Sequence, residues 1–367
     1  MSNRENAARA ASAIRGSLIG GAVGDALGYA VEFIAWPAIQ EKYGKAGIQA
    51  YDLHTPTGEA IISDDTQMTL FTLNGLLCHD AAALKSGADE PAERYIWQAY
   101  RDWYHCQYAP DVPPDNISWL SGVKAMHAWR APGNTCLNAI AAGRPGSTVD
   151  AVNRSKGCGG IMRVAPAALY YRDPADILKG DRLAAEAAAM THGHPLGWIP
   201  SAAFAHIVGR AAFGGCPYGG LEGIVRESME AVARLFPGNP YLSAQQALVD
   251  QAVMLAHRRE VPDAQALHTL GGGWVGDEAL ADAVFCCLRY PDDFSKAVIA
   301  AVNHSGDSDS TGAIVGNIIG AYLGMEAIEP RWLDRLEARD EILRLADDLI
   351  DGAAAMDEAH LGRYLVD

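Results

Sequence analysis

Apolar residues recur along most of this chain at the spacing of one face of an α-helix. In one segment, for example, Leu280, Ala283, Val284, Cys287 and Leu288 fall on the same side of a helical wheel. This i, i+3, i+4, i+7 spacing is typical of amphipathic helices that cover a core. Similar spacing predicts helices over residues 7–26, 66–84, 94–104, 181–190, 201–213, 223–235, 244–257, 277–288, 294–302, 313–323 and 337–350.

The segments between these predicted helices contain few signs of β-structure. Alternating runs of β-branched residues are scarce and no strand–helix repeat is evident, which argues against a parallel α/β sheet. Gly and Pro residues punctuate the connections, and none is long enough to read as an interdomain linker. We therefore expect an all-α fold, with a single compact domain over residues 8–352 and a C-terminal extension over residues 353–367.

The composition narrows the kinds of partner that this chain can bind. It has 367 residues, of which 49% are hydrophobic and 20% charged, as in a globular protein with a sizeable core. The formal net charge of −16 argues against a nucleic-acid duplex or an anionic membrane as partner, because phosphate groups attract basic faces. No signal pattern or membrane span is evident. The 7 cysteines show no C-x-x-C spacing, so a reducing cytoplasm is expected rather than a disulfide framework.

Two clusters of acidic and hydroxyl residues each precede an apolar helical stretch. The first acidic cluster is Ser63-Asp64-Asp65-Thr66, and the second is Asp307-Ser308-Asp309-Ser310-Thr311. Helix capping explains part of each cluster, because Asp and Ser are favoured N-cap residues. One cap needs only one residue, however, and carboxylates packed this closely repel unless a cation neutralises them. Such hard oxygen donors suit Mg²⁺, Mn²⁺ or Ca²⁺, so we expect a two-metal centre if the fold joins the clusters.

The second acidic cluster shares part of its pattern with two other acidic motifs. An EF-hand loop that begins at Asp307 needs a bidentate Glu at its twelfth position, where this chain has Ile318, so that interpretation fails. The Asp-x-Asp loop of a phosphatase should follow a buried strand, whereas the segment before Asp307 has helical spacing. A metal-dependent Asp-x-Asp phosphatase therefore remains only an alternative.

A stripe of small residues lies in the first predicted helix. Glycines at positions 16, 20, 21, 24 and 28 share this segment with Asp25, and Glu32 follows four residues after the last of them. Each glycine inside a helix costs about 0.5–1 kcal/mol relative to alanine, so their accumulation indicates a close approach. The approaching group is either another helix or a ligand.

A glycine loop over residues 155–163 reads Ser-Lys-Gly-Cys-Gly-Gly-Ile-Met-Arg. Free backbone N–H groups in such a loop can bind an anion, and Lys156 and Arg163 are expected to add positive charge. The order of residues is not that of a Walker A loop. Cys158 has no evident partner base, which favours a small buried thiol over a nucleophile.

Two further motifs carry aromatic or imidazole groups. Thr191-His192-Gly193-His194 has no cysteine or acidic neighbour, which favours hydrogen-bonding or stacking histidines over a zinc site. Gly271-Gly272-Gly273-Trp274 is a flexible loop with an aromatic side chain. Its tryptophan either stacks on a base or covers the core.

Together these motifs resemble one family, the ADP-ribosylglycohydrolases, which include the dinitrogenase-reductase-activating glycohydrolases. The matching segments are 20–28 with Glu32, 63–66, 157–163 with Pro166, 191–192, 271–274 and 306–310, in the order that the family shows. They extend from about residue 14 to residue 320, which is most of the chain. The combination is specific, although no single motif is.

The resemblance implies an all-α fold, two divalent cations, Mg²⁺ or Mn²⁺, and cleavage of the bond between ADP-ribose and an acceptor. The metal ligands that it implies are Glu32, Ser63, Asp64, Asp65, Asp307, Asp309 and Ser310. The catalytic residues that it implies are Glu32, Asp64, Asp65 and Asp307. The substrate-binding residues that it implies are Ser155, Lys156, Gly157, Gly159, His192, Gly271, Gly273 and Trp274. Many relatives have asparagine where this chain has Cys158, and threonine where it has Ser63 and Ser310.

The function expected from this resemblance is hydrolysis of ADP-ribose from a modified protein side chain, with arginine favoured, by a water that the cations activate. A carboxylate from Glu32 or from the Asp64/Asp65 pair would act as the general acid or base, and nearby carboxylates would stabilise oxocarbenium-like charge. An ADP-ribose-binding or toxin-neutralising protein with little turnover is the alternative from another class. ADP-ribose conjugates other than proteins also stay open as substrates.

Overall fold

The computed structural model describes residues 3–87, 90–108, 115–214 and 219–365. Within these ranges the chain forms helices and no strand, and its only β-type pairings are isolated bridges. The expected all-α fold is confirmed. No helix in this part of the chain has both the length and the apolar character needed to cross a bilayer. Six cysteines form no disulfide, and Cys216 lies outside the described residues.

Each segment with helical spacing overlaps a helix of the structure. The α-helices are α1 (Asn3–Tyr29), α2 (Trp36–Tyr43), α3 (Asp64–Ser86), α4 (Ala92–Tyr108), α5 (Asn134–Ala141), α6 (Ala165–Tyr170), α7 (Ile177–Ala189), α8 (Pro195–Phe213), α9 (Gly220–Leu235), α10 (Leu242–His257), α11 (Asp263–Leu270), α12 (Gly276–Arg289), α13 (Phe294–Val302), α14 (Ser308–Leu323), α15 (Pro330–Leu333), α16 (Arg339–Asp351) and α17 (Glu358–Leu361). The 3₁₀ helices are η1 (Trp119–Gly122), η2 (Lys124–His127), η3 (Cys158–Arg163), η4 (Met325–Ala327) and η5 (Ala353–Ala355).

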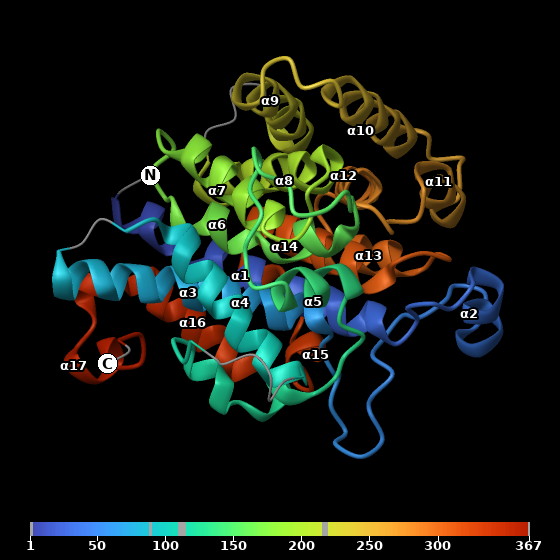
Figure 1. Ribbon diagram of the computed structural model, residues 1–367. Helices are drawn as coiled ribbons and strands as arrows, with labels where there is room; N and C mark the ends of the chain where they lie inside the picture. The colour runs from blue at the N-terminus through green and yellow to red at the C-terminus, as the bar shows by residue number, and fades with distance from the viewer. Residues whose placement is uncertain (1–2, 88–89, 109–114, 215–218, 366–367) are drawn as a thin grey trace.

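Helices α1 and α14 form the centre of the bundle, as Figure 1 shows, with α3, α4 and α16 to one side and α7, α8 and α12 to the other. The glycine stripe of α1 faces three glycines of α14, at positions 312, 316 and 320. A Cβ atom at Gly20 would collide with the Gly316 carbonyl, and one at Gly24 with the Gly312 carbonyl. The pairing order is antiparallel, since Gly16 meets Gly320 while Gly28 meets Ser308. Tight helix packing, not ligand approach, therefore explains the stripe.

This antiparallel contact places the last turn of α1 beside the first turn of α14. The chain leaves α1 through a further turn in which the Glu32 amide donates to the Gly28 carbonyl at 2.9 Å. The start of α3 joins them because the buried Asp25 carboxylate of α1 accepts hydrogen bonds from the amides of Ser63 and Thr66, at 3.0 and 3.1 Å. Three helix ends thus meet at one point.

The chain beyond residue 352 folds back onto the bundle. It contains η5 and α17, and Tyr364 is almost fully buried. The Tyr364 hydroxyl donates to the Asp348 carboxylate of α16. This contact ties the end of the described chain to α16.

Candidate active site

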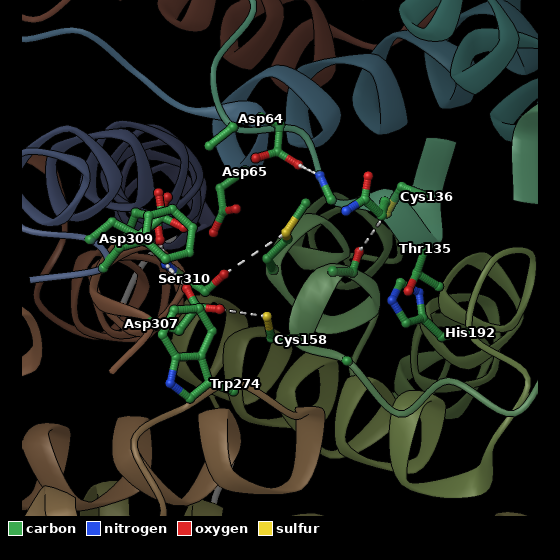
Figure 2. Close-up of a pocket in the computed structure, with 18 residues that line it drawn as sticks. Asp64, Asp65, Thr135, Cys136, Cys158, His192, Trp274, Asp307, Asp309 and Ser310 are labelled. Carbon is green, nitrogen blue, oxygen red and sulfur yellow. Dashed lines mark hydrogen bonds between the residues drawn. The ribbon is translucent and has the colours of Figure 1, made fainter. Parts of the chain in front are cut away.

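One pocket opens where the three helix ends meet, and Figure 2 shows the side chains around it. Most of the residues singled out from the sequence reach this pocket. It is lined by Glu32, Phe33, Asp64, Asp65, Ala131, Gly133, Asn134, Thr135, Cys136, Gly157, Cys158, Gly159, Met162, His192, Trp274, Asp307, Asp309 and Ser310. The two acidic clusters, far apart in sequence, therefore share one pocket with Glu32 and the glycine loop.

The carboxylates occupy one side of the pocket. Glu32, Asp307 and Asp309 each offer an oxygen within 4.8 Å of the others, so these three side chains can hold one cation. Asp64 and Asp65, from the first turn of α3, line the same pocket. Figure 2 shows Asp65, Asp309 and Asp307 along one side and His192 and Thr135 on the other.

Burial makes full ionisation of these carboxyls costly. It raises the pKa of Glu32 to about 8, and the charges of Asp307 and Asp64 add to the effect. Burial also raises the pKa of Asp64 to about 8, and it raises the pKa of Asp65 and Asp309 well above the ordinary range, with neighbouring carboxylates contributing. Glu32 Oε2 and Asp65 Oδ2 are buried without a hydrogen-bond partner. Divalent cations relieve both problems, so the donor set fits the metals that the sequence suggested.

Both acidic clusters also cap their helices. The Ser63 hydroxyl accepts from the Asp65 amide at 3.2 Å, and Asp307 Oδ1 accepts from the Ser310 amide at 3.4 Å. Ser63 is fully buried and does not line the pocket, so its hydroxyl serves α3 in this structure. Capping still leaves carboxylate oxygens for the pocket, because each cluster has more oxygens than its cap uses.

The segment before the second acidic cluster decides the phosphatase alternative. An Asp-x-Asp nucleophile loop should follow a strand, but Asp307 follows α13 and a short connection. The Asp307 amide donates to the Gly272 carbonyl at 2.8 Å, which joins this helix mouth to the loop of residues 271–274. The second acidic cluster is therefore the N-cap and first turn of a buried helix, and the phosphatase alternative lacks the strand that it needs.

The opposite wall of the pocket consists of the glycine loop and His192. A Cβ at Gly159 would press on the His192 ring and on Cys136 at 3.1 Å, so glycine allows the loop to lie against both. His192 Nδ1 lies 2.8 Å from the Thr191 hydroxyl, and burial, with the Arg163 charge, lowers the pKa of His192 to about 3. The imidazole is therefore neutral at physiological pH. Its bond to Thr191 fits the hydrogen-bonding role expected for it.

Arg163 does not contribute the positive charge that the glycine loop was expected to have. It is fully buried, with its Nη2 donating to the Thr191 hydroxyl at 2.6 Å and its guanidinium 4.3 Å from the centre of the Tyr100 ring. Lys156 pairs with Asp277 at 3.3 Å and does not line the pocket. Side-chain charge therefore does not hold an anion on this wall, and the amides of Gly157 and Cys158 already bond to the Ser155 hydroxyl and the Trp274 carbonyl.

The remaining predicted substrate residues lie just behind the lining. The Ser155 hydroxyl is 3.1 Å from that of Thr135, which does face the pocket. Gly271 and Gly273 have φ values of 130° and 82°, which favour glycine, and they shape the loop that presents Trp274. A Cβ at Gly273 would lie 2.5 Å from the Thr311 methyl group. These residues support the pocket from outside its surface.

Residues 134–147 are a candidate pocket loop from the sequence, but the sequence did not place them at this wall, and it gave no sign of one thiol contact. Residues 133–136 line the pocket at the start of α5, and the Gly133 amide donates to Asp64 Oδ2 at 3.1 Å. The Cys158 thiol donates to Asp307 Oδ2 at 2.8 Å. Burial and the Asp307 charge raise the pKa of Cys158 well above its usual range, so this thiol is a donor and a poor nucleophile.

Comparison with known proteins agrees with this architecture. The chain matches the ADP-ribosylglycohydrolase family over residues 6–359. It is 27% identical to ADP-ribosylhydrolase ARH3 of Mus musculus, over 94% of this chain and 92% of that protein. It is 28% identical to ADP-ribosyl-[dinitrogen reductase] glycohydrolase of Rhodospirillum rubrum, over 91% of this chain and 94% of that protein.

A solved structure described as an ADP-ribosylglycohydrolase-related protein complex has the same fold. It aligns with a TM-score of 0.62 and 25% identity, covering 95% of this chain and 100% of the other. The family match spans all three helix ends and both walls of the pocket. This chain belongs to the ADP-ribosylglycohydrolase family and is an enzyme that hydrolyses linkages to ADP-ribose.

Proposed function

We propose that this enzyme removes ADP-ribose from a modified protein side chain, with arginine as the favoured acceptor, and that it uses two divalent cations, Mg²⁺ or Mn²⁺. The observation that carries the proposal is the convergence of Glu32, Asp307 and Asp309, whose carboxylate oxygens lie within 4.8 Å of one another. The Rhodospirillum rubrum relative is named for an ADP-ribosylated protein, dinitrogen reductase, and this name supports a modified protein as the substrate.

The residues that would hold the cations come from all three helix ends. They are Glu32, Asp64, Asp65, Asp307 and Asp309, with the hydroxyl of Ser310, whereas the hydroxyl of Ser63 stays with its cap of α3. When bound, divalent cations lower the pKa of water and neutralise the crowded carboxylates. The raised pKa values of Glu32 and Asp64 support this assignment, because they show how unfavourable uncompensated charge is here.

The substrate's own charges orient it in the pocket. A diphosphate would lie against the wall of Gly157 to Gly159, beside the neutral His192, because the carboxylates of the other side would be occupied with the cations. This placement leaves the ribose that bears the acceptor at the acidic side. Ser155 and Lys156 adjoin the glycine loop behind the pocket lining, where Lys156 pairs with Asp277, so they would support the diphosphate site indirectly.

The carboxylates would then carry out the proton transfers. One of Glu32, Asp64 or Asp65 takes a proton from the attacking water, and a carboxyl of the same set gives a proton to the departing acceptor atom. The bond from the anomeric carbon to the acceptor breaks and the bond to the water oxygen forms. Negative charge beside that carbon stabilises its oxocarbenium character.

A release assay tests the proposal directly. The protein is incubated with ADP-ribosyl-arginine and ADP-ribosyl-serine peptides, with Mg²⁺, with Mn²⁺ or with chelator, and free ADP-ribose is measured. We expect metal-dependent release, faster from the arginine peptide. Binding of ADP-ribose without release from either peptide would instead indicate a binding protein.

A further inference from the structure

A carboxylate late in the chain joins two segments that lead to the pocket. Glu337 lies in the connection between α15 and α16, and only 12% of its side chain is exposed. Its Oε2 accepts a hydrogen bond from the Ile62 amide at 3.1 Å, and its Oε1 accepts one from Arg130 Nη2 at 3.2 Å. Glu337 itself does not line the pocket. Its influence on the site therefore passes through the segments that it contacts.

Both partners of Glu337 adjoin Asp64. Ile62 precedes Asp64 by two residues, just before α3 begins. The Arg130 carbonyl accepts from the Asp64 amide at 3.2 Å. The Gly133 amide donates to Asp64 Oδ2 at 3.1 Å, the bond drawn beside Asp64 in Figure 2. Segment 130–133 thus holds Asp64 by its backbone and by its carboxylate, and Glu337 bonds both to this segment and to the residues that lead into α3.

The backbone around Glu337 fixes it in this place. The Ala60 amide donates to the Arg335 carbonyl at 2.8 Å, and the Glu337 amide donates to the Ala60 carbonyl at 3.0 Å. Ala338 has a φ of 57°, a left-handed conformation that residues with a side chain seldom adopt. Such a conformation persists where the surrounding structure imposes it. The segment that carries Glu337 is therefore held firmly against the residues that precede α3.

The ion pair between Glu337 and Arg130 is partly shielded from water. The Arg130 side chain is 17% exposed. Burial raises the pKa of Glu337, while the charge of Arg130 acts in the opposite direction. Breaking such a pair is costly, because the remaining charge stays poorly solvated. The cost falls when segment 130–133 moves so that water reaches Arg130, and Asp64, which is bonded to this segment, then moves as well.

A carboxylate that binds a metal depends on the groups that orient it. Loss of a partner behind a metal ligand typically lowers metal affinity about 10–100-fold. Asp64 lines the same pocket as the three convergent carboxylates. We propose that Glu337 is a positioning residue that acts through Ile62 and Arg130 and holds Asp64 where it can help to bind a divalent cation. This inference rests on the proposed metal-dependent function and adds a residue from outside the pocket.

Manganese binding tests this role directly. The Kd of Mn²⁺ is measured by electron paramagnetic resonance on the whole protein, and kcat is measured with an ADP-ribosylated peptide. We expect Glu337→Ala to raise the Kd about tenfold and to lower kcat at limiting Mn²⁺. Glu337→Gln keeps an acceptor for the Ile62 amide but loses the charge that pairs with Arg130, so its effect should be smaller. Asp340→Ala removes a carboxylate that is 73% exposed on α16, and as the matched control it should leave the Kd unchanged.

A second background separates positioning from general stability. If Glu337 acts through Asp64, Glu337→Ala should change the Kd by less than about twofold in protein that already carries Asp64→Asn. A substitution that merely loosens the fold weakens Mn²⁺ binding by the same factor in both backgrounds. Equal factors in the two backgrounds, or an unchanged Kd in the Glu337 variants, overturn the inference.

The outcomes also separate this inference from the proposed function. If the unmodified protein binds Mn²⁺ and releases ADP-ribose while the Glu337 variants bind Mn²⁺ as tightly, only the positioning role is wrong. If the unmodified protein binds no Mn²⁺, the proposed cations are wrong and the inference falls with them. Should circular dichroism show that Glu337→Ala does not fold, Glu337→Gln in both backgrounds gives the same comparison.

Discussion

The acidic clusters at the N-termini of α3 and α14 are alike in composition but are held in place by different contacts. At α3, the cap comes from Ser63 and from the remote Asp25, and Asp64 is held by the Gly133 amide. At α14, Asp307 caps its own helix, and its carboxylate converges with those of Asp309 and Glu32. The first cluster thus depends on a carboxylate from another helix for its cap, while the second supplies its own carboxylate cap and two of the three convergent oxygens. Similar sequence clusters thus reach one site by different physical means.

Removal of the convergent carboxylate should have the largest effect. We expect Asp307→Ala to abolish turnover of an ADP-ribosylated peptide while the circular-dichroism spectrum stays helical, because the variant loses one of three converging oxygens. Asp64→Asn should retain more activity, since an amide oxygen can still accept from the Gly133 amide. Full metal-dependent activity in Asp307→Ala would show that the site is wrongly assigned.

Loss of the Asp25 carboxylate, which caps α3, should lower the stability of the fold. Asp25→Ala leaves the buried amides of Ser63 and Thr66 without their acceptor. Each unsatisfied buried group costs about 1–3 kcal/mol, so the free energy of unfolding in urea should fall by at least that amount. Asn6→Ala, at an exposed position of the same helix, is the matched control. An unchanged denaturation midpoint for Asp25→Ala would contradict the capping role.

Chelation should reveal how strongly the crowded carboxyls resist ionisation. The pKa of Glu32 and that of Asp64 rise from 4.5 and 3.8 to about 8 on folding, so the folded protein binds more protons than the unfolded chain in this window. Stability contributed by these groups is present at low pH and is lost as pH rises toward about 8. We expect the Tm in chelator to fall between about pH 5 and pH 8. Mg²⁺ or Mn²⁺ should reduce that fall, and equal slopes with and without metal would count against a cation site.

Substitution of Cys158, whose thiol bonds to Asp307, should have the smallest effect on activity. Cys158 donates to Asp307, a bond that the hydroxyl of Cys158→Ser can also make. We expect Cys158→Ser to change kcat/KM by about threefold or less and Cys158→Ala to lower it further, because a net hydrogen bond contributes about 0.5–1.5 kcal/mol. Activity that survives in both variants also tests whether the thiol acts as a nucleophile, since a nucleophile could not be replaced by alanine.

Much of the helical architecture could be predicted because helix periodicity is local. The segments around Thr66, Leu280 and Ala313 carry their apolar faces within a few turns, and the structure has helices there. The site was only partly predictable. Asp64 and Asp309 supply more carboxylates than a helix cap needs, and this signal is local in sequence. The burial of Arg163 and the pocket wall at Thr135 depend instead on which helices pack together.

By itself the sequence determined most of the longer helices, the chemistry of the two acidic clusters and a glycine stripe that demanded close approach. The tertiary structure decided what that approach was. Antiparallel packing of α1 on α14 brings Glu32 to Asp309, and Asp25 brings α3 to both. It also decided that Phe33 and Trp274, which are 241 positions apart (274 − 33), stack at the pocket mouth. Contacts of this kind depend on backbone proximity between distant segments, which no local pattern of side chains specifies.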